Sequence, residues 1–215
     1  MDDRTEVLEK LRRLCEEGSP THRARKSTPS RPGSEATLPQ EFRSEIEALG
    51  GELYEEPDEA AALERCASIL REAGARRIVA WSSPLVEGLA SVLSPEAAVR
   101  TPEGDIARWR EECFEAQAGV TEADFGIAET GTLVLADGPG RSRLASLTPP
   151  LHVALLRRTR LLANLGAFFD LLAREPDWKG RFLTFVTGPS RTADIEKKLV
   201  LGVHGPERLA VVLHG

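Results

Sequence analysis

The sequence predicts an α/β domain in which a mostly parallel β-sheet is covered by helices on both faces and carries one β-hairpin. Short apolar runs alternate with segments of helical periodicity from residue 40 onward, which is the rhythm of βαβ units. Two apolar runs are separated by only four residues, which favours a hairpin. The chain has 215 residues, 41% hydrophobic and 29% charged, a length and balance that suit one globular domain.

The segment before residue 40 is expected to lie outside this domain. Apolar side chains at helical spacing predict an amphipathic helix within residues 1–18. These side chains are Val7, Leu8, Leu11, Leu14 and Cys15. Residues 19–39 are rich in Ser, Thr, Pro and Gly and carry four basic side chains, so we expect a flexible linker; contact of this basic run with an acidic partner is the alternative. The domain itself is then expected over residues 40–215.

The first half of the domain alternates helices and strands. Helices are expected over residues 41–51, 58–73, 84–94 and 105–119, and strands over residues 52–56 and 76–81. Gly50 and Gly51 end the first helix, and Pro84 suits the first turn of the third. Ile106, Trp109 and Cys113 share one side of the fourth helix, which is the side expected to pack on the sheet.

The second half is richer in strands. Strands are expected over residues 123–128, 132–136, 151–156, 181–188 and 208–214, and helices over residues 164–175 and within 192–202. The four residues Glu129 to Thr132 join the first two strands, either as a plain hairpin turn or as a presented site. We favour a presented site, because a typical turn dipeptide, Asp137-Gly138, lies at the far end of the second strand.

Charge and composition narrow the classes of function. The net charge of −6 disfavours a nucleic-acid-binding domain, which needs a concentrated basic face. No apolar run approaches the roughly 20 residues of a membrane span, and the charged N-terminus does not resemble a secretory signal, so we expect a cytoplasmic protein. The 3 cysteines are isolated from one another and the 4 histidines lack ligand spacing, so no metal site is expected.

Two further stretches carry side chains suited to binding or proton transfer. Gly188 ends a predicted strand, and Ser190, Arg191 and Thr192 follow at an apparent helix start, where backbone N–H groups favour a carboxylate or phosphate. The alternative is that these residues only cap the helix. His204 lies in a predicted turn, either as a structural residue or as a proton shuttle.

The loop before the strand at residues 151–156 contains two arginines, and a histidine stands at the start of that strand. Arg141 or Arg143 is suited to a bidentate clamp on a substrate carboxylate. An exposed loop with two solvated arginines is an equal alternative. His152 is the nearby histidine.

Three stretches in this order closely resemble the LUD-domain family of LutC-type lactate utilisation proteins: GVTEADFGIAETGTLVL, GPSRTADIE and LGVHGP. The resemblance covers roughly residues 40–215. It implies a three-layer α/β/α fold of the NagB/RpiA/CoA-transferase-like type and a cytoplasmic role in oxidising L-lactate to pyruvate together with partner subunits. Larger proteins of that system carry clustered cysteines for iron–sulfur centres. This chain lacks such clusters, so its cofactors are expected on an iron–sulfur partner subunit.

Two functional hypotheses follow. In the first, the chain is a subunit that binds a small carboxylate or effector. The expected ligand-binding residues are Thr130, Gly131, Gly188, Ser190, Arg191 and Thr192, with Glu129 and His204 as candidate catalytic residues. In the second, the chain is a stand-alone enzyme acting on an acyl-CoA or sugar-phosphate-like substrate, and Glu129 is the nucleophile, because a glutamate before an x-Gly turn has that role in CoA transferases. Whether the chain is itself an enzyme stays open.

The linker hypothesis predicts the outcome of limited proteolysis. Trypsin should cut first between Arg23 and Arg31 and leave a compact fragment containing residues 40–215, because an unfolded basic segment is accessible to the protease. Mass spectrometry of the fragments identifies the cleavage sites. Resistance of this segment under native conditions would contradict the hypothesis.

Overall fold

The computed structural model describes residues 36–215 apart from five short gaps. The gaps are residue 103 and residues 176–177, 179–180, 194–198 and 202–204. Only the backbone is described over residues 191–193 and 199–201. The expected amphipathic helix and most of the expected linker lie outside the described residues.

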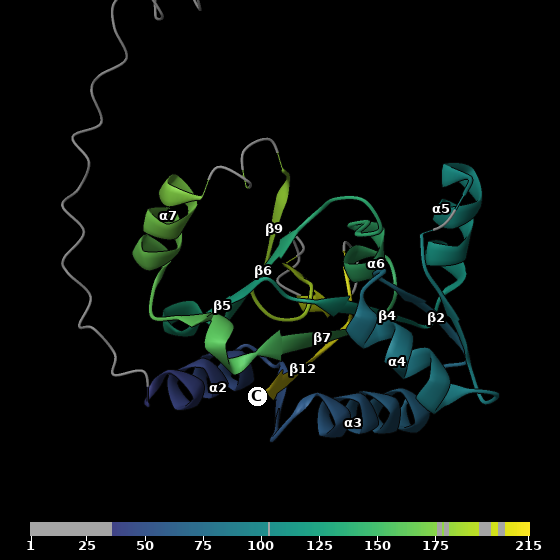
Figure 1. The fold of residues 1–215 in the computed structure, drawn as a ribbon, viewed down its shortest axis with the longest axis horizontal. Coiled ribbons are helices and arrows are strands. Elements are labelled where there is room, and N and C mark those ends of the chain that lie inside the picture. The colour runs from purple at the N-terminus through teal and green to yellow at the C-terminus, as the bar shows by residue number, and fades with distance from the viewer. Residues whose placement is uncertain (1–35, 103, 176–177, 179–180, 194–198, 202–204) are drawn as a thin grey trace, which may run out of the picture. The chain divides into compact units, whose positions relative to one another are not determined.

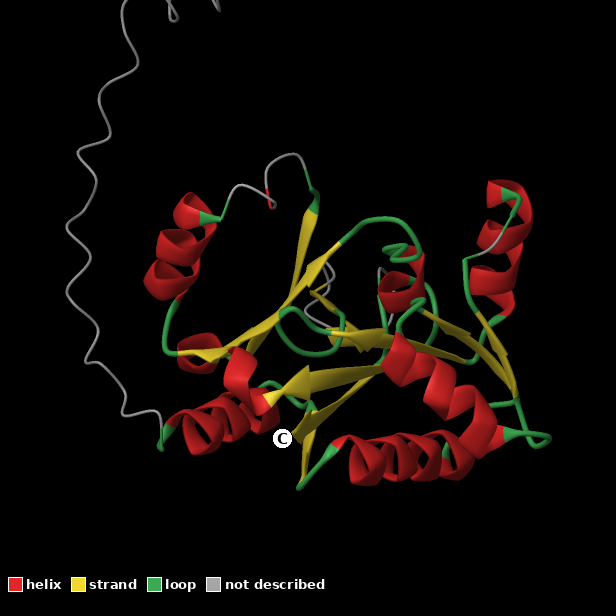
Figure 2. Ribbon diagram, viewed as in Figure 1, coloured by secondary structure: helices red, strands yellow, loops and turns green. Residues whose placement is uncertain are grey.

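A parallel sheet of six strands forms the centre of the domain, which confirms the predicted fold class (Figures 1 and 2). Its strands are β1 (Glu52–Glu56), β2 (Arg77–Ala80), β3 (Ala98–Arg100), β4 (Ala118–Glu122), β7 (Leu151–Arg157) and β12 (Arg208–His214). They lie in the order β1-β12-β7-β4-β2-β3, and every neighbouring pair is parallel. The C-terminal strand therefore lies inside the sheet.

Helices cover both faces of this sheet, giving three layers. They are α2 (Leu38–Ala48), α3 (Glu59–Glu72), α4 (Pro84–Leu93), α5 (Ile106–Glu115) and α6 (Leu144–Leu147), whereas α7 (Leu165–Arg174) packs on a smaller second sheet. Two of these helices begin at N-capping side chains. Asp58 Oδ1 accepts from Ala61 N at 2.8 Å at the start of α3, and Ser83 caps α4 before Pro84.

Alternation along the strands separates two cores. In β12, Ala210 and Val212 pack with α3 and α4, whereas Leu209, Val211 and Leu213 face α2 and the second sheet. All five side chains are buried, as expected for a parallel strand covered on both faces.

A second sheet lies over the face that α2 covers. It has the order β8-β5-β6-β9, with bounds Leu161–Leu162, Phe125–Ile127, Thr132–Ala136 and Leu183–Val186. Strands β5 and β6 form the predicted hairpin, joined by a 3-10 turn over Ala128–Thr130. A small separate core around Phe125 and Phe168 joins this sheet to α7.

Three local predictions are wrong or incomplete. The helix expected over residues 105–119 ends at Glu115 and is followed by β4, whose small residues allow α6 to approach closely. The short edge strand β3 was not predicted. The helix expected within residues 192–202 is wrong for its described residues, because β10 (Arg191–Ala193) pairs antiparallel with β11 (Leu199–Leu201) and places the β-branched Thr192 opposite Val200. Residues 194–198 and 202 lie outside the described residues.

The face predicted for α5 is only partly correct. Trp109 and Cys113 are buried against the core, but the side chain of Ile106 is 82% exposed.

The contact between β4 and α6 generates a stability prediction. A Cβ atom on Gly119 would lie 1.7 Å from the carbonyl oxygen of Ala145, so Gly119→Ala forces backbone apart and should lower the free energy of unfolding by about 3 kcal/mol or more. Urea unfolding measures the change. Gly138→Ala is the matched control, because its Cβ would meet only Arg181 Nη1 at 4.0 Å. Equal stability of the two variants would contradict the close approach.

Candidate functional site

The predicted turn between β5 and β6 lies against the C-terminal half of α2. Gly131 adopts φ 58°, and a Cβ atom there would lie 2.8 Å from the backbone nitrogen of Ile46. Both the left-handed conformation and the close approach require glycine. Glu129 and Thr130 are exposed, and the backbone N–H of Glu129 donates to Ala163 O at 3.0 Å.

Threonine hydroxyls connect this turn to the segment that follows β9. The hydroxyls of Thr130 and Thr132 are 2.7 Å apart, and those of Thr132 and Thr187 are 2.8 Å apart. The next residue, Gly188, has φ 91° and packs on Leu49, to which a Cβ atom would come within 3.0 Å. Residues distant in the sequence thus meet in one hydroxyl-rich cluster.

The third stretch reaches the same region through Ser190. Its backbone N–H donates to Pro206 O at 2.8 Å, and a Cβ atom on Gly205 would lie 3.2 Å from Ser190 Cβ. His204 lies outside the described residues. We call the assembly of the turn at 129–132, residues 187–190 and residues 205–206 the motif cluster. It lies at the amino edge of the parallel sheet, because Pro206 precedes β12 and α2 ends before β1.

The backbone of Arg191 and Thr192 differs from the helix start that the sequence predicts. The sequence placed Arg191 and Thr192 at a helix N-terminus, but their backbone belongs to β10. A helix terminus therefore supplies no positive potential there. A bound carboxylate would depend on hydroxyl and backbone donors and on the charge of Arg191.

A pocket of 440 Å³ opens at the opposite, carboxyl edge of the sheet. Ser82 and Ser83 line it after β2, Glu122 and Asp124 at and after the end of β4, and Arg160 after β7. Strands β2 and β4 are neighbours whose connections leave in opposite directions, to β3 on one side and β7 on the other. The pocket thus lies at a topological switch point, where open α/β sheets bind their ligands.

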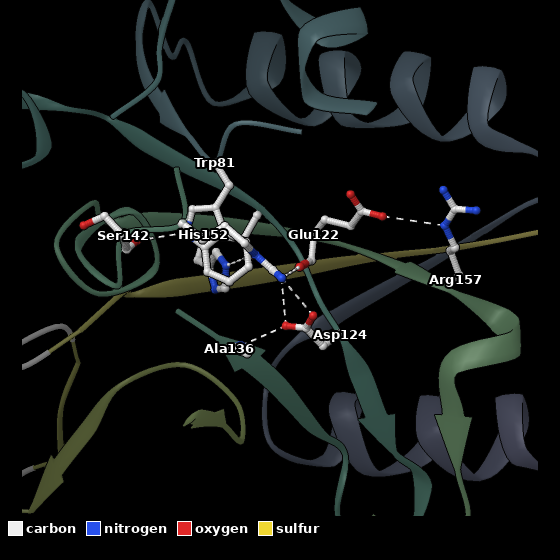
Figure 3. A network of polar contacts seen from close by, with 9 residues as sticks. Trp81, Glu122, Asp124, Ala136, Ser142, His152 and Arg157 are labelled. Carbon is white, nitrogen blue, oxygen red and sulfur yellow. Dashed lines mark hydrogen bonds and ion pairs between the residues drawn. The ribbon is translucent and has the colours of Figure 1, made fainter. Parts of the chain in front are cut away.

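A bidentate ion pair forms part of the pocket wall (Figure 3). Arg141 Nη1 donates to Asp124 Oδ1 at 3.0 Å and Nη2 to Oδ2 at 2.7 Å, while the guanidinium lies 4.2 Å from the centroid of the Trp81 ring. Asp124 Oδ2 also accepts from Ala136 N at 2.8 Å. Arg141 Nη2 donates to the carbonyl of Glu122 at 3.2 Å. The arginine is thus held on several sides.

A looser pair lies beside it. Arg157 approaches Glu122 at 3.6 Å and Glu59 at 2.7 Å, and its side chain is 50% exposed. Figure 3 shows the carboxylate of Glu122 facing this guanidinium. Glu122 is therefore constrained much less than Asp124.

The structure resolves the alternatives for the loop arginines. Arg141 lines the pocket but pairs with Asp124, whereas Arg143 is exposed and lies over the Phe182 ring at 5.1 Å. His152 is fully buried, with Nε2 2.9 Å from Thr121 Oγ1. Within the described part of the chain its Nδ1 has no hydrogen-bond partner.

Sequence reasoning missed the pocket residues Ser82, Glu122, Asp124 and Arg160. The sequence pattern that could have indicated them is a polar side chain directly after an apolar strand. It was obscured because the first two residues of β4 were placed in the preceding helix and the other three in no element.

The described residues contain no group of three acidic, cysteine or histidine side chains able to hold a metal ion. Cys66 and Cys113 are free and buried, and burial raises the pKa of both thiols to about 12. These thiols therefore stay protonated and unreactive at neutral pH. None of the described helices combines the length and apolar character that crossing a membrane requires.

The fold and the pocket define a three-layer α/β protein with a pocket at the carboxyl edge of its parallel sheet. Residues 39–214 match the LUD domain, and the chain belongs to the LUD domain family. It is similar to lactate utilization protein C of Halalkalibacterium halodurans, with 33% identity over 68% of this chain and 66% of the relative. The protein of the same name from Shouchella clausii is 32% identical over 65% of this chain and 63% of its own length.

These alignments therefore span just under two thirds of the relatives' length. A DUF162 family protein from Deinococcus radiodurans has a similar fold, with a TM-score of 0.64 and 25% identity. The match covers 86% of this chain and 100% of that protein. The predicted family is confirmed.

The burial of His152 predicts a pH dependence of stability. Burial lowers its pKa from the ordinary 6.5 to about 4, so the unfolded chain takes up this proton first as the pH falls. Stability is lost as the pH drops from 6.5 toward 4, by up to about 3 kcal/mol from this residue. Urea unfolding at several pH values should show a smaller loss in His152→Gln than in the wild type. Parallel pH profiles would contradict the assignment.

Proposed function

We propose that this chain acts in lactate utilisation, as a cytoplasmic subunit of a system that oxidises L-lactate to pyruvate, and that it binds a small carboxylate at the motif cluster. Membership of the LUD domain family and the names of the relatives support the process. The observation that supports the binding site is the convergence of three separate sequence stretches. The hydroxyls of Thr130, Thr132 and Thr187 join the first two stretches, and the backbone N–H of Ser190, which donates to Pro206 O, joins the third.

The chemistry of the cluster suits a small 2-hydroxy acid. Hydroxyl groups donate hydrogen bonds to a carboxylate, and Arg191 supplies a compensating charge. Glu129 is exposed at the turn, available to accept a proton from a ligand hydroxyl, with His204 as a second proton carrier. In this proposal the redox centres are iron–sulfur clusters on partner subunits, because the cysteines of this chain are far apart in sequence.

A second candidate function rests on the exposure of Glu129 directly before the Thr130-Gly131 turn. In this alternative its carboxylate attacks the thioester carbonyl of an acyl-CoA, which forms a glutamyl–acyl mixed anhydride and releases the CoA thiolate. The thiolate then attacks the glutamyl carbonyl of the anhydride, which gives a glutamyl–CoA thioester and releases the acyl group as a free carboxylate. Peptide mass spectrometry after incubation with acyl-CoA tests for this adduct at Glu129. Its appearance would favour the enzyme over the binding subunit, and an unmodified peptide would count against it.

Replacement of Arg191 tests the proposed carboxylate site. We expect Arg191→Ala to remain folded by circular dichroism but to lose L-lactate binding in calorimetry and lactate-dependent growth in a strain lacking the wild-type chain. A desolvated charge pair typically contributes roughly 2 to 4 kcal/mol, against about 0 to 1 for a solvated arginine.

The matched control is Arg174→Ala, an exposed arginine at the end of α7. It should bind and complement like the wild type. Full complementation and unchanged binding by folded Arg191→Ala would overturn the carboxylate site. Purification of the native protein with its partners separately tests whether redox centres accompany it.

A further inference from the structure

We propose that the pocket at the carboxyl edge is a second ligand site, which binds a small molecule carrying both hydroxyl groups and one anionic group, phosphate or carboxylate. It lies at the opposite edge of the parallel sheet from the motif cluster. Its volume of 440 Å³ falls within the range of about 300 to 1,000 Å³ typical of small-molecule sites. The proposal therefore goes beyond the carboxylate site described above.

One of the three arginines that line the pocket forms no ion pair with any described residue. Arg141 is paired with Asp124, and Arg157 is shared between Glu59 and Glu122. Arg160 also lines the pocket, but within the described ranges no carboxylate forms an ion pair with it. Its guanidinium lies 5.3 Å from the centroid of the Phe125 ring, which supports the side chain without neutralising it. An anionic group of a ligand can therefore pair with Arg160 without displacing a carboxylate of a described residue.

Hydroxyl donors surround the same space. Ser82 and Ser83 precede α4, and Thr159 is the neighbour of Arg160. Among the described residues no hydrogen bond engages the hydroxyls of Ser82 or Thr159. The start of α4 adds partial positive charge to this side of the pocket. These groups suit the oxygen atoms of a phosphate or carboxylate.

A carboxylate acceptor that also lines the pocket accounts for the expected hydroxyl groups of the ligand. Among the described residues, Arg157 alone pairs with the Glu122 carboxylate, at 3.6 Å, and Glu122 lines the pocket. Asp124, in contrast, accepts from Arg141 and Ala136. A neutral hydroxyl that donates to Glu122 would bind there, whereas a second anion would be repelled.

Three probes with one carbon skeleton test the proposal by calorimetry on the full chain. Glucose 6-phosphate carries a phosphate, gluconate carries a carboxylate, and glucose is neutral. We expect at least one of the two anions to bind in the millimolar range or tighter, and glucose to bind about tenfold more weakly or not at all. Binding of one anion alone identifies which group the pocket prefers.

Replacement of the unpaired cation localises the binding. Arg160→Gln should weaken the bound anion by about tenfold or more, as expected for loss of a charged hydrogen bond. Arg76→Gln removes the same charge from the exposed amino end of β2 and should change the affinity less than about twofold. Failure of both anions to bind, equal binding of glucose, or unchanged affinity in folded Arg160→Gln would each overturn the proposal.

Discussion

The ion pair between Asp124 and Arg141 determines where the hairpin lies on the parallel sheet. Asp124 separates β4 from β5 and accepts the backbone N–H of Ala136 at the end of β6. Arg141 donates to the carbonyl of Glu122 and lies over the ring of Trp81. The pair therefore connects the ends of β2, β4 and β6. The side chains are only 14% and 23% exposed, and breaking such a pair leaves an uncompensated charge, which typically costs about 3 to 5 kcal/mol.

This anchoring gives the two ends of one hairpin different surroundings. Its base meets the switch point between β2 and β4, where the carboxyl edge opens into the pocket. Its tip reaches the C-terminal half of α2, where Gly131 packs against Ile46 and Thr132 contacts Thr187. Gly131 at the tip and the Asp124–Arg141 pair at the base therefore both hold the hairpin in place across the sheet. Both candidate sites depend on it.

The sequence predicted correctly those elements that are bounded by capping residues, proline or glycine. Asp58 before α3 and Pro84 in α4 are examples, and the hairpin followed from two apolar runs close together. Strand β4 was missed because its small residues follow a helix without a clear break, and Gly119 is explained only by the approach of Ala145. The meeting of the three motif stretches was predicted through family resemblance. The pocket depends on strand order, which no local pattern contains.

Arg141 and Arg160 both line the pocket at the carboxyl edge but differ in role. The charge of Arg141 is structural, whereas that of Arg160 is available to a ligand. The sequence favoured Arg141 equally as a carboxylate clamp and as a solvated side chain, and neither describes it. Its donors already meet Asp124 and the carbonyl of Glu122, so a ligand that captured it would detach the base of the hairpin. Arg160 carries the same charge a few residues after β7, and its guanidinium lies over the ring of Phe125 and forms no ion pair with a described residue. An anion can bind Arg160 without breaking an ion pair. For that reason we propose that Arg160, and not Arg141, binds the anionic group of the ligand.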